Sequence, residues 1–273
     1  MALNFIKLQR ETIKKVVDLS KSFDGIEAIF IMGSHAKDEE SSFSDIDIGL
    51  VFSDPERQQR EEIFNKVADL YPSLCVLWLY DKNGLFLYQN GVRLDLDFLT
   101  QKDLKDWGLS KVKIVYDPYN KYRDRAKKTD NKHSSAPKPK WRDEDGSIVD
   151  WFFWMFRQAY CYIRRGETNE KRSFNKFYSA QTSLSSIREK LLEMKIYING
   201  KHDYMTVIDK DFAKQIALTF TDLNPNSMTK ATKKLFELFV ITAKQYCEKT
   251  NKEFPENKVL VMRKLFDEFD NAG

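Results

Sequence analysis

The sequence predicts an α+β protein, in which a sheet domain flanked by helices is followed by an all-α helical bundle. Up to about residue 120, short apolar runs with an alternating pattern are separated by turn signals, which is typical of strands. After residue 147, apolar residues recur at a period near 3.6, which is typical of helices. A charged, proline-containing linker at about 122–145 separates the halves. Since 273 residues also favour two domains, we expect one over 1–140, including most of the linker, and another over 146–273.

The first half begins with an amphipathic helix at residues 5–21, whose apolar positions follow the helical period. Further elements are expected in this order: strands at 26–32 and 45–52, a helix from Pro55 to Tyr71, and strands at 74–80, 85–88, 91–99 and 112–117. Asn90-Gly91 is a strong turn signal between two of these strands. Asp117-Pro118 ends the last strand, which we expect at an edge of the sheet.

The second half reads as helices. The first, Trp151 to Arg165, is densely aromatic, and Gly166 is expected to interrupt it. Further helices are expected at 173–194, 210–220, 230–249 and 257–269, with Ser227 as the N-cap of the third of these.

Two carboxylates share one face of the strand predicted at 45–52. Side chains of a strand alternate between its faces, so Asp45 and Asp47 lie together, roughly 6 to 7 Å apart at their Cα atoms, while Ile46 and Ile48 point the other way. Charges on an otherwise hydrophobic strand are costly unless they are paired. The partner that best suits two carboxylates is a hard divalent cation such as Mg²⁺.

Gly33-Ser34, at the end of the preceding strand, adds an anion site. Glycine lets the backbone pass close to a ligand, and serine is a preferred helix-capping residue. A strand, a Gly-Ser turn and the start of a helix would together direct free N–H groups at an anion such as phosphate.

A third carboxylate is available on the strand at 91–99, where Arg93, Asp95 and Asp97 share one face by the same alternation. It can join Asp45 and Asp47 if the two strands are neighbours. Asp95 and Asp97 compete for this place, since they lie roughly 6 to 7 Å apart along the strand. Arg93 either compensates the negative charge, contacts phosphate or forms an ordinary structural ion pair.

The run Gly33 to Asp47, GSHAKDEESSFSDID, places ten residues between Gly-Ser and Asp-x-Asp and resembles the signature of the polymerase-β-like nucleotidyltransferase superfamily. The order of sheet domain, linker and helical bundle resembles streptomycin-type aminoglycoside adenylyltransferases and lincosamide nucleotidyltransferases, as does the Arg93-to-Leu96 strand, RLDL. The loop departs from those families at Lys37 to Glu40, KDEE, where a basic, glycine-containing run is usual.

This resemblance implies a mixed, mostly antiparallel sheet and Mg²⁺-dependent transfer of a nucleoside monophosphate, AMP from ATP, to a hydroxyl of a small antibiotic. It implies that Asp45, Asp47 and Asp95 bind metal and act in catalysis, with Asp95 matching the third position best. Gly33 and Ser34, with Asp45 and Asp47, would bind the nucleotide. In the superfamily, the third Asp binds metal or activates the acceptor hydroxyl.

The aromatic helix has two interpretations. Trp, Phe and Met at helical spacing usually pack against other helices, which favours a role in the core. Aromatic residues nevertheless occupy nearly every side of this helix. Trp151, Trp154 and Tyr160 could therefore form a platform for a nucleobase or a drug-like acceptor.

Composition narrows the location and partners. No signal-like N-terminus and no run of about 18 apolar residues is present, so we expect a cytoplasmic protein without a membrane partner. Cys75, Cys161 and Cys247 lack metal-binding or redox spacing and are expected to be reduced. A net charge of +4, with interspersed signs, argues against nucleic acid as a partner. We expect a monomer or homodimer.

Two other functions remain open. One is nucleotidyl transfer to a protein or tRNA, which the helical domain and the lack of a basic stripe disfavour. The other is a catalytically silent relative that senses nucleotides, which the intact Asp45, Asp47 and Asp95 disfavour.

Overall fold

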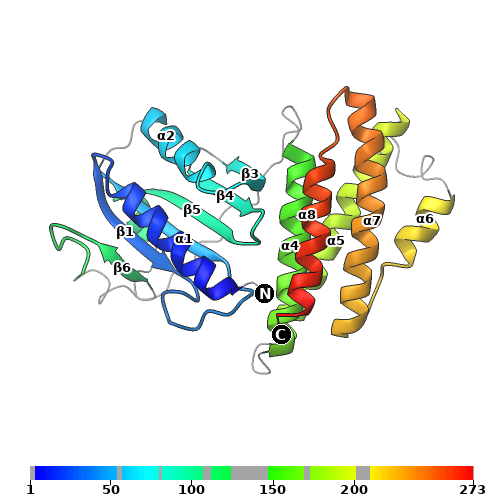
Figure 1. Cartoon of the computed structure of the whole chain (residues 1–273), viewed down its shortest axis with the longest axis horizontal. Helices are drawn as coiled ribbons and strands as arrows, with labels where there is room; N and C mark the ends of the chain where they lie inside the picture. The colour runs from blue at the N-terminus through cyan, green and yellow to red at the C-terminus, as the bar shows by residue number, and fades with distance from the viewer. Residues whose placement is uncertain are drawn as a thin grey trace. The chain divides into compact units, whose positions relative to one another are not determined.

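The computed structural model describes residues 4–53, 57–79, 82–106, 112–123, 147–168, 173–200 and 210–272. Contacts between Cα atoms divide the chain into two compact units, Leu3–Trp141 and Arg142–Gly273. The first is built on a sheet and the second of helices (Figure 1). The linker predicted at about 122–145 lies, apart from its first two residues, outside the described residues.

The first unit contains one six-stranded sheet with the strand order β3-β4-β5-β2-β1-β6. Its elements are α1 (Phe5–Ser20), β1 (Ile26–Met32), β2 (Ile46–Phe52), α2 (Arg57–Ala68), β3 (Ser73–Leu79), β4 (Asn83–Tyr88), β5 (Arg93–Thr100), α3 (Asp103–Asp106) and β6 (Lys113–Tyr116). Only β2 and β5 pair in parallel among these strands, and the other neighbours pair antiparallel. The predicted mixed, mostly antiparallel sheet is confirmed, and β6 lies at its edge as expected.

Helices α1 and α2 cover one face of this sheet (Figure 1). The main core of the unit forms there, where Val16 of α1 and Ile63 of α2 pack with Ile48 of β2 and Leu96 of β5, all fully buried. Because side chains alternate along a strand, the residues between these apolar positions point to the other face. The alternation therefore directs Asp47 away from the helices.

That other face carries a second, smaller apolar cluster. Its buried members are Ala28, Phe30, Val51, Leu99, Leu104 and Tyr122. Gly49 lies beside this cluster, and a Cβ added there would meet Leu99 Cδ1 at 3.0 Å. The face is thus apolar toward the C-terminal part of β2 and acidic toward its start.

The segment after β1 differs from the sequence-based expectation. No helix begins at Ser34: residues 33–38 form turns, in which the Ser34 carbonyl accepts the N–H groups of Lys37 (3.1 Å) and Glu39 (3.0 Å). Gly33 has φ +64°, a left-handed conformation that favours glycine. The chain reverses there, and the expected helix N-terminus is absent from this described segment.

The second unit is helical, as predicted. It contains α4 (Ser147–Thr168), α5 (Ser173–Asn199), α6 (Lys210–Ala217), α7 (Pro225–Thr250) and α8 (Glu256–Asp270). The aromatic residues of α4 form its core, since Phe152, Phe153 and Phe156 surround Phe236 and Phe239 of α7 with ring centroids 4.6 to 6.4 Å apart.

Tyr160, one of the three residues considered for an acceptor platform, also belongs to this core. Its ring stacks on Phe266 of α8 with centroids 4.8 Å apart, and its hydroxyl donates to Asp270. Trp151 and Trp154 are each only 4% exposed. The core interpretation therefore describes Tyr160, and the platform interpretation does not.

The predictions made for Gly166 and Ser227 were wrong. α4 continues through Gly166, where the missing side chain lets the ring of Phe177 approach: a Cβ there would lie 2.7 Å from Phe177 Cδ1. α7 begins earlier than expected, because Asn224, and not Ser227, is its N-cap and Pro225 fits the first turn. No helix among the described residues is long and apolar enough to cross a membrane.

Candidate active site

Asp47 and Asp95 occupy directly opposed positions on the two parallel strands. The register of β2 and β5 pairs Asp47 with Asp95 and Gly49 with Asp97. Neighbouring strands lie about 4.8 Å apart, so the two carboxylates project side by side from the face opposite α1 and α2. β5, the strand predicted to supply the third carboxylate, is thus a neighbour of β2.

Arg93 lies among these acidic side chains. Its Nη2 donates to Asp95 Oδ2 at 2.9 Å and its Nε to Asp95 Oδ1 at 3.2 Å, a two-pronged contact. Its Nη1 lies 3.8 Å from Asp45 Oδ2. The Arg93 side chain is 8% exposed, compared with about a fifth for the two carboxylates. Arg93 therefore links Asp45, just before β2, to Asp95 on β5.

Asp47 is the carboxylate with the least compensation. Among the described residues, no hydrogen bond or ion pair to it is found. Burial raises the pKa of Asp47 well above its ordinary value; Asp45 and Asp95 raise this pKa further, while Arg93 lowers it. An acidic group in this setting is suited to a cation.

The backbone at Gly33 lies close to the Asp47 side chain. A Cβ built on Gly33 would clash with the Asp47 carboxylate, so only glycine leaves room for this side chain. The Oγ of the next residue, Ser34, is buried and has no hydrogen-bond partner in the described part of the chain. A buried hydroxyl without a partner is unfavourable unless a ligand supplies one. Of the predicted pair Gly33 and Ser34, Gly33 thus lies beside Asp47, and Ser34 follows it in sequence.

Asp97 has a different environment from Asp95. Its Oδ1 accepts a hydrogen bond from Asn83 Nδ2 of β4 at 2.6 Å. Burial raises the pKa of Asp97 to about 6, and the bond from Asn83 acts in the opposite direction. Asp97 is therefore hydrogen-bonded to a neutral partner and lies opposite Gly49, two residues further along β2 than Asp47.

The donor atoms fit a hard divalent cation, which prefers carboxylate and hydroxyl oxygens. As the side chains stand, Asp45 and Asp95 share the guanidinium of Arg93, and the described residues contain no group of three or more His, Cys, Asp or Glu side chains placed to hold a metal ion. Binding would require these carboxylates to turn from Arg93 toward Asp47.

Gln9 contacts the loop that precedes Asp45, and sequence reasoning missed this contact. The side chain of Gln9 is 1% exposed on α1 and contacts the carbonyls of the loop that leads to Asp45. No local pattern signals this contact, because the partners lie 32 to 35 residues apart.

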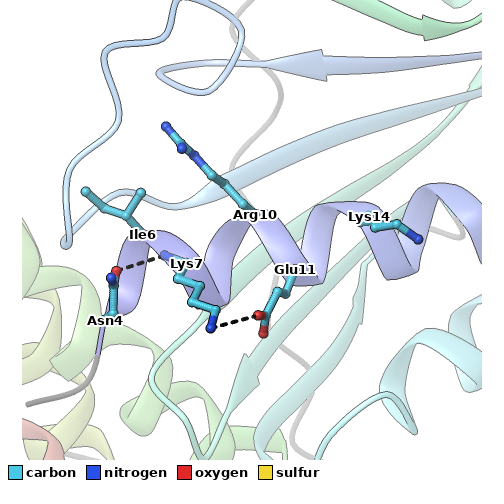
Figure 2. A pocket seen from close by; sticks show the side chains of 6 residues that line it. All are labelled: Asn4, Ile6, Lys7, Arg10, Glu11 and Lys14. Carbon is cyan, nitrogen blue, oxygen red and sulfur yellow. Dashed lines mark hydrogen bonds and ion pairs between the residues drawn. The ribbon is translucent and has the colours of Figure 1, made fainter. Parts of the chain in front are cut away.

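A surface hollow of about 380 Å³ lies elsewhere on α1. It is lined by Asn4, Ile6, Lys7, Arg10, Glu11 and Lys14, all on the first turns of that helix or just before it. Figure 2 shows Lys7 and Glu11 paired on one side of α1, while Arg10 projects from another. None of the predicted site residues lines this hollow.

Residues 13–115 match a family model described as polymerase beta, nucleotidyltransferase. The match runs from α1 to β6 and contains the predicted site residues Gly33, Ser34, Asp45, Asp47 and Asp95, together with Asp97. The chain therefore contains a nucleotidyltransferase domain of the polymerase β type. No curated protein matches the chain in sequence.

Three solved structures illustrate the range of similar proteins. An aminoglycoside 6-adenyltransferase from Bacillus subtilis is 14% identical, with 96% of this chain and 98% of that chain covered and a TM-score of 0.39. A spectinomycin adenyltransferase from Enterococcus faecialis, solved with ATP and spectinomycin, is 14% identical, with 97% and 99% covered and a TM-score of 0.27. A CD-NTase from Bradyrhizobium diazoefficiens, solved in complex with GTP, is 11% identical, with 96% and 93% covered and a TM-score of 0.29. Similarity this low carries no argument about the acceptor.

Proposed function

We propose that this protein transfers AMP from ATP, in the presence of Mg²⁺, to a hydroxyl of a small antibiotic such as an aminoglycoside or a lincosamide. The observation that carries the proposal is the pairing of Asp47 with Asp95 across two parallel strands, beside Gly33 and Ser34, within a nucleotidyltransferase domain. Asp47 is a partly buried acidic group to which no hydrogen bond or ion pair is found among the described residues, as expected of a group that binds a cation.

Asp45 and Asp47 would hold Mg²⁺, and Asp95 would complete the set. Bound Mg²⁺ supplies positive charge that offsets the charge developing on the triphosphate oxygens. Ser34 would donate its buried hydroxyl to a phosphate oxygen, and Gly33 lets the backbone approach the nucleotide. Arg93 would take part of the negative charge of Asp95 or of a phosphate.

Asp95 would also accept the proton of the acceptor hydroxyl. As that proton moves to a carboxylate oxygen of Asp95, the acceptor oxygen bonds to the α-phosphorus of ATP, the bond from that phosphorus to the bridging oxygen breaks, and pyrophosphate leaves. Asp95 must be ionised for this role.

The domain order supports the proposed acceptor class. A nucleotidyltransferase domain followed by a helical region resembles the layout of aminoglycoside and lincosamide enzymes, and the helical unit would bind the acceptor. Cys75, Cys161 and Cys247 are buried and form no disulfide, which supports a cytoplasmic location.

The test is mass spectrometry of the protein incubated with ATP, Mg²⁺ and a panel of aminoglycosides and lincosamides. We expect one panel member to gain the mass of AMP with wild type and none with Asp47→Asn. AMP transferred only to a protein or to tRNA added in the same reaction would contradict the small-molecule acceptor. No transfer to any acceptor would contradict the enzymatic proposal.

A further inference from the structure

The side-chain amide of Gln9 holds a loop far away in sequence. Gln9 Nε2 lies 3.2 Å from the carbonyl oxygen of Ser41, 3.3 Å from that of Ser42 and 3.0 Å from that of Ser44. The Gln9 side chain is 1% exposed, so water does not replace these contacts. Three carbonyl groups of one loop thus converge on a single donor nitrogen of α1.

This geometry requires a donor at position 9. Nε2 carries two hydrogens, which the three carbonyl oxygens share, whereas Gln9 Oε1 has no hydrogen-bond partner in the described part of the chain. Turning the amide over would place Oε1 against three carbonyl oxygens, so the observed orientation is strongly favoured. A side chain of similar size without an N–H would leave the carbonyls without this donor.

The loop that Gln9 holds is compact. Ser41 N–H donates to Ser44 Oγ at 3.0 Å, and Ser44 N–H donates to the Ser41 carbonyl at 3.0 Å. Phe43, between them, is only 2% exposed. The carbonyl of Ser44, which makes the shortest contact with Gln9, belongs to the peptide group that also contains the N–H of Asp45. A hydrogen bond that holds this carbonyl therefore also holds the peptide plane between Ser44 and Asp45.

The next residue of α1 adds a second tie to the same loop. Arg10 donates from Nη2 and Nε to Glu40 Oε1, at 2.7 and 3.1 Å. Figure 2 shows Arg10 projecting from a different side of α1 than Lys7 and Glu11. Unlike Gln9, the Arg10 side chain is largely exposed, so Gln9 makes the buried part of this attachment. Both residues precede the range 13–115 that matches the family.

We propose that Gln9 is a positioning residue: by holding the carbonyls of Ser41, Ser42 and Ser44, it sets the place of Asp45 in the acidic site. The consequence for Mg²⁺ rests on the proposed function, while the hold on the loop does not. Residues that orient a metal ligand commonly change metal affinity about 10- to 100-fold when they are replaced.

The first measurement is amide hydrogen exchange by NMR at Ser41, Phe43 and Ser44. Gln9→Met keeps the length of the side chain and removes the donor, and we expect roughly tenfold faster exchange at these amides. Val16→Ala is the control, because Val16 is a buried residue of the same helix that packs in the main core. Val16→Ala should leave exchange in the loop unchanged. Unchanged exchange in Gln9→Met would overturn the proposal.

The second measurement is the Mg²⁺ concentration that gives half of the thermal stabilisation at saturating ATP. We expect it to rise about tenfold or more in Gln9→Met and to stay unchanged in Val16→Ala. Faster loop exchange with an unchanged Mg²⁺ requirement would overturn the link to Asp45. A wild-type protein that does not respond to Mg²⁺ and ATP would contradict the proposed function, and hydrogen exchange would still decide whether Gln9 holds the loop.

A second variant covers the case in which Gln9→Met does not fold. Gln9→Asn keeps the amide but is one methylene shorter, so its nitrogen cannot reach all three carbonyls from the same backbone position. The same increase in exchange and in Mg²⁺ requirement is expected, and wild-type values for both would overturn the proposal.

Discussion

Asp47 faces Asp95 across the parallel pair β2 and β5, and no hydrogen bond or ion pair to Asp47 is found within the described residues. Arg93 meanwhile holds Asp95 with two hydrogen bonds and approaches Asp45. The negative charge of the site is therefore balanced unevenly. Asp45 and Asp95 share a cation of the chain itself, whereas Asp47 needs one from outside or must hold a proton.

Replacing either predicted metal ligand should abolish transfer. Asp45→Asn and Asp47→Asn each remove a ligand charge without disturbing the apolar face of β2, so both variants should fold and retain below about 1% of the transfer rate. The measurement is AMP transfer to the accepted antibiotic, with circular dichroism to verify folding. More than a few per cent of activity in both folded variants would refute their assignment as ligands.

The two aspartates of β5 should differ in importance. Asp95→Asn removes a carboxylate beside Asp47 and should cost at least about 10²-fold in kcat. Asp97→Asn should cost far less, because Asp97 is engaged by Asn83 and lies opposite Gly49. Steady-state kinetics of the two variants distinguishes them, and the reverse ranking would move the third carboxylate to Asp97.

The stability of the metal-free protein should depend on pH through Asp97. Burial raises the pKa of Asp97 from its ordinary value of 3.8 to about 6, so the folded state favours the protonated form. The resulting stability is present at low pH and is lost as pH rises through about 6. The melting temperature of Asp97→Asn should therefore equal that of wild type at pH 4 and lie a few degrees above it at pH 8.

Asp103→Asn is the control of opposite sign. Burial would raise the pKa of Asp103, but hydrogen bonds from Thr100 and Lys82 outweigh it and lower this pKa. Asp103 thus stabilises the fold above its unfolded pKa, and this stability is lost as pH falls. Asp103→Asn should melt below wild type at pH 8, with the difference shrinking toward low pH. Melting curves in a chelator from pH 4 to 8 measure both, and a lower melting temperature of Asp97→Asn at pH 8 would contradict the role given to Asp97.

Arg93 should stabilise the metal-free protein. Arg93→Gln leaves Asp45 and Asp95 without their shared cation, which should lower the free energy of unfolding by about 3 kcal/mol. Arg263→Gln is a matched control, since Arg263 makes the same two-pronged contact with Glu237 on an exposed surface and should cost below about 1 kcal/mol. Urea unfolding measures both, and equal losses would show that Arg93 forms an ordinary ion pair.

Alternation along the strands was the most informative part of the sequence. It predicted that Asp47 and Asp95 lie on the opposite face of the sheet from Ile48 and Leu96. The structure has this arrangement, with Ile48 and Leu96 in the main core. The sequence could not predict that β2 and β5 are adjacent in the sheet. α2, β3 and β4 lie between them in sequence, and parallel pairing leaves no local signal.

Other features depend on contacts that a local pattern does not encode. Serine is a preferred helix cap, so Ser34 predicted a helix. In the structure the Ser34 carbonyl instead accepts hydrogen bonds that form turns, and the helix does not form. Gly166 reads as a helix break, yet it provides space for Phe177 of α5. The role of Gln9 depends on a buried contact across more than thirty residues.

The most direct test of the account is a thermal-shift titration of wild type and Asp47→Asn with Mg²⁺ and ATP. Ligands that bind only the folded protein raise its stability by mass action, roughly 2.7 kcal/mol at a hundredfold excess over Kd. We expect the wild-type melting temperature to rise with concentration. Asp47→Asn should be unchanged or slightly more stable without ligand, because it removes a buried charge, and largely unresponsive to Mg²⁺ and ATP. A wild type indifferent to Mg²⁺ and ATP, or an Asp47→Asn variant that responds as strongly as wild type, would contradict the site at Asp45, Asp47 and Asp95.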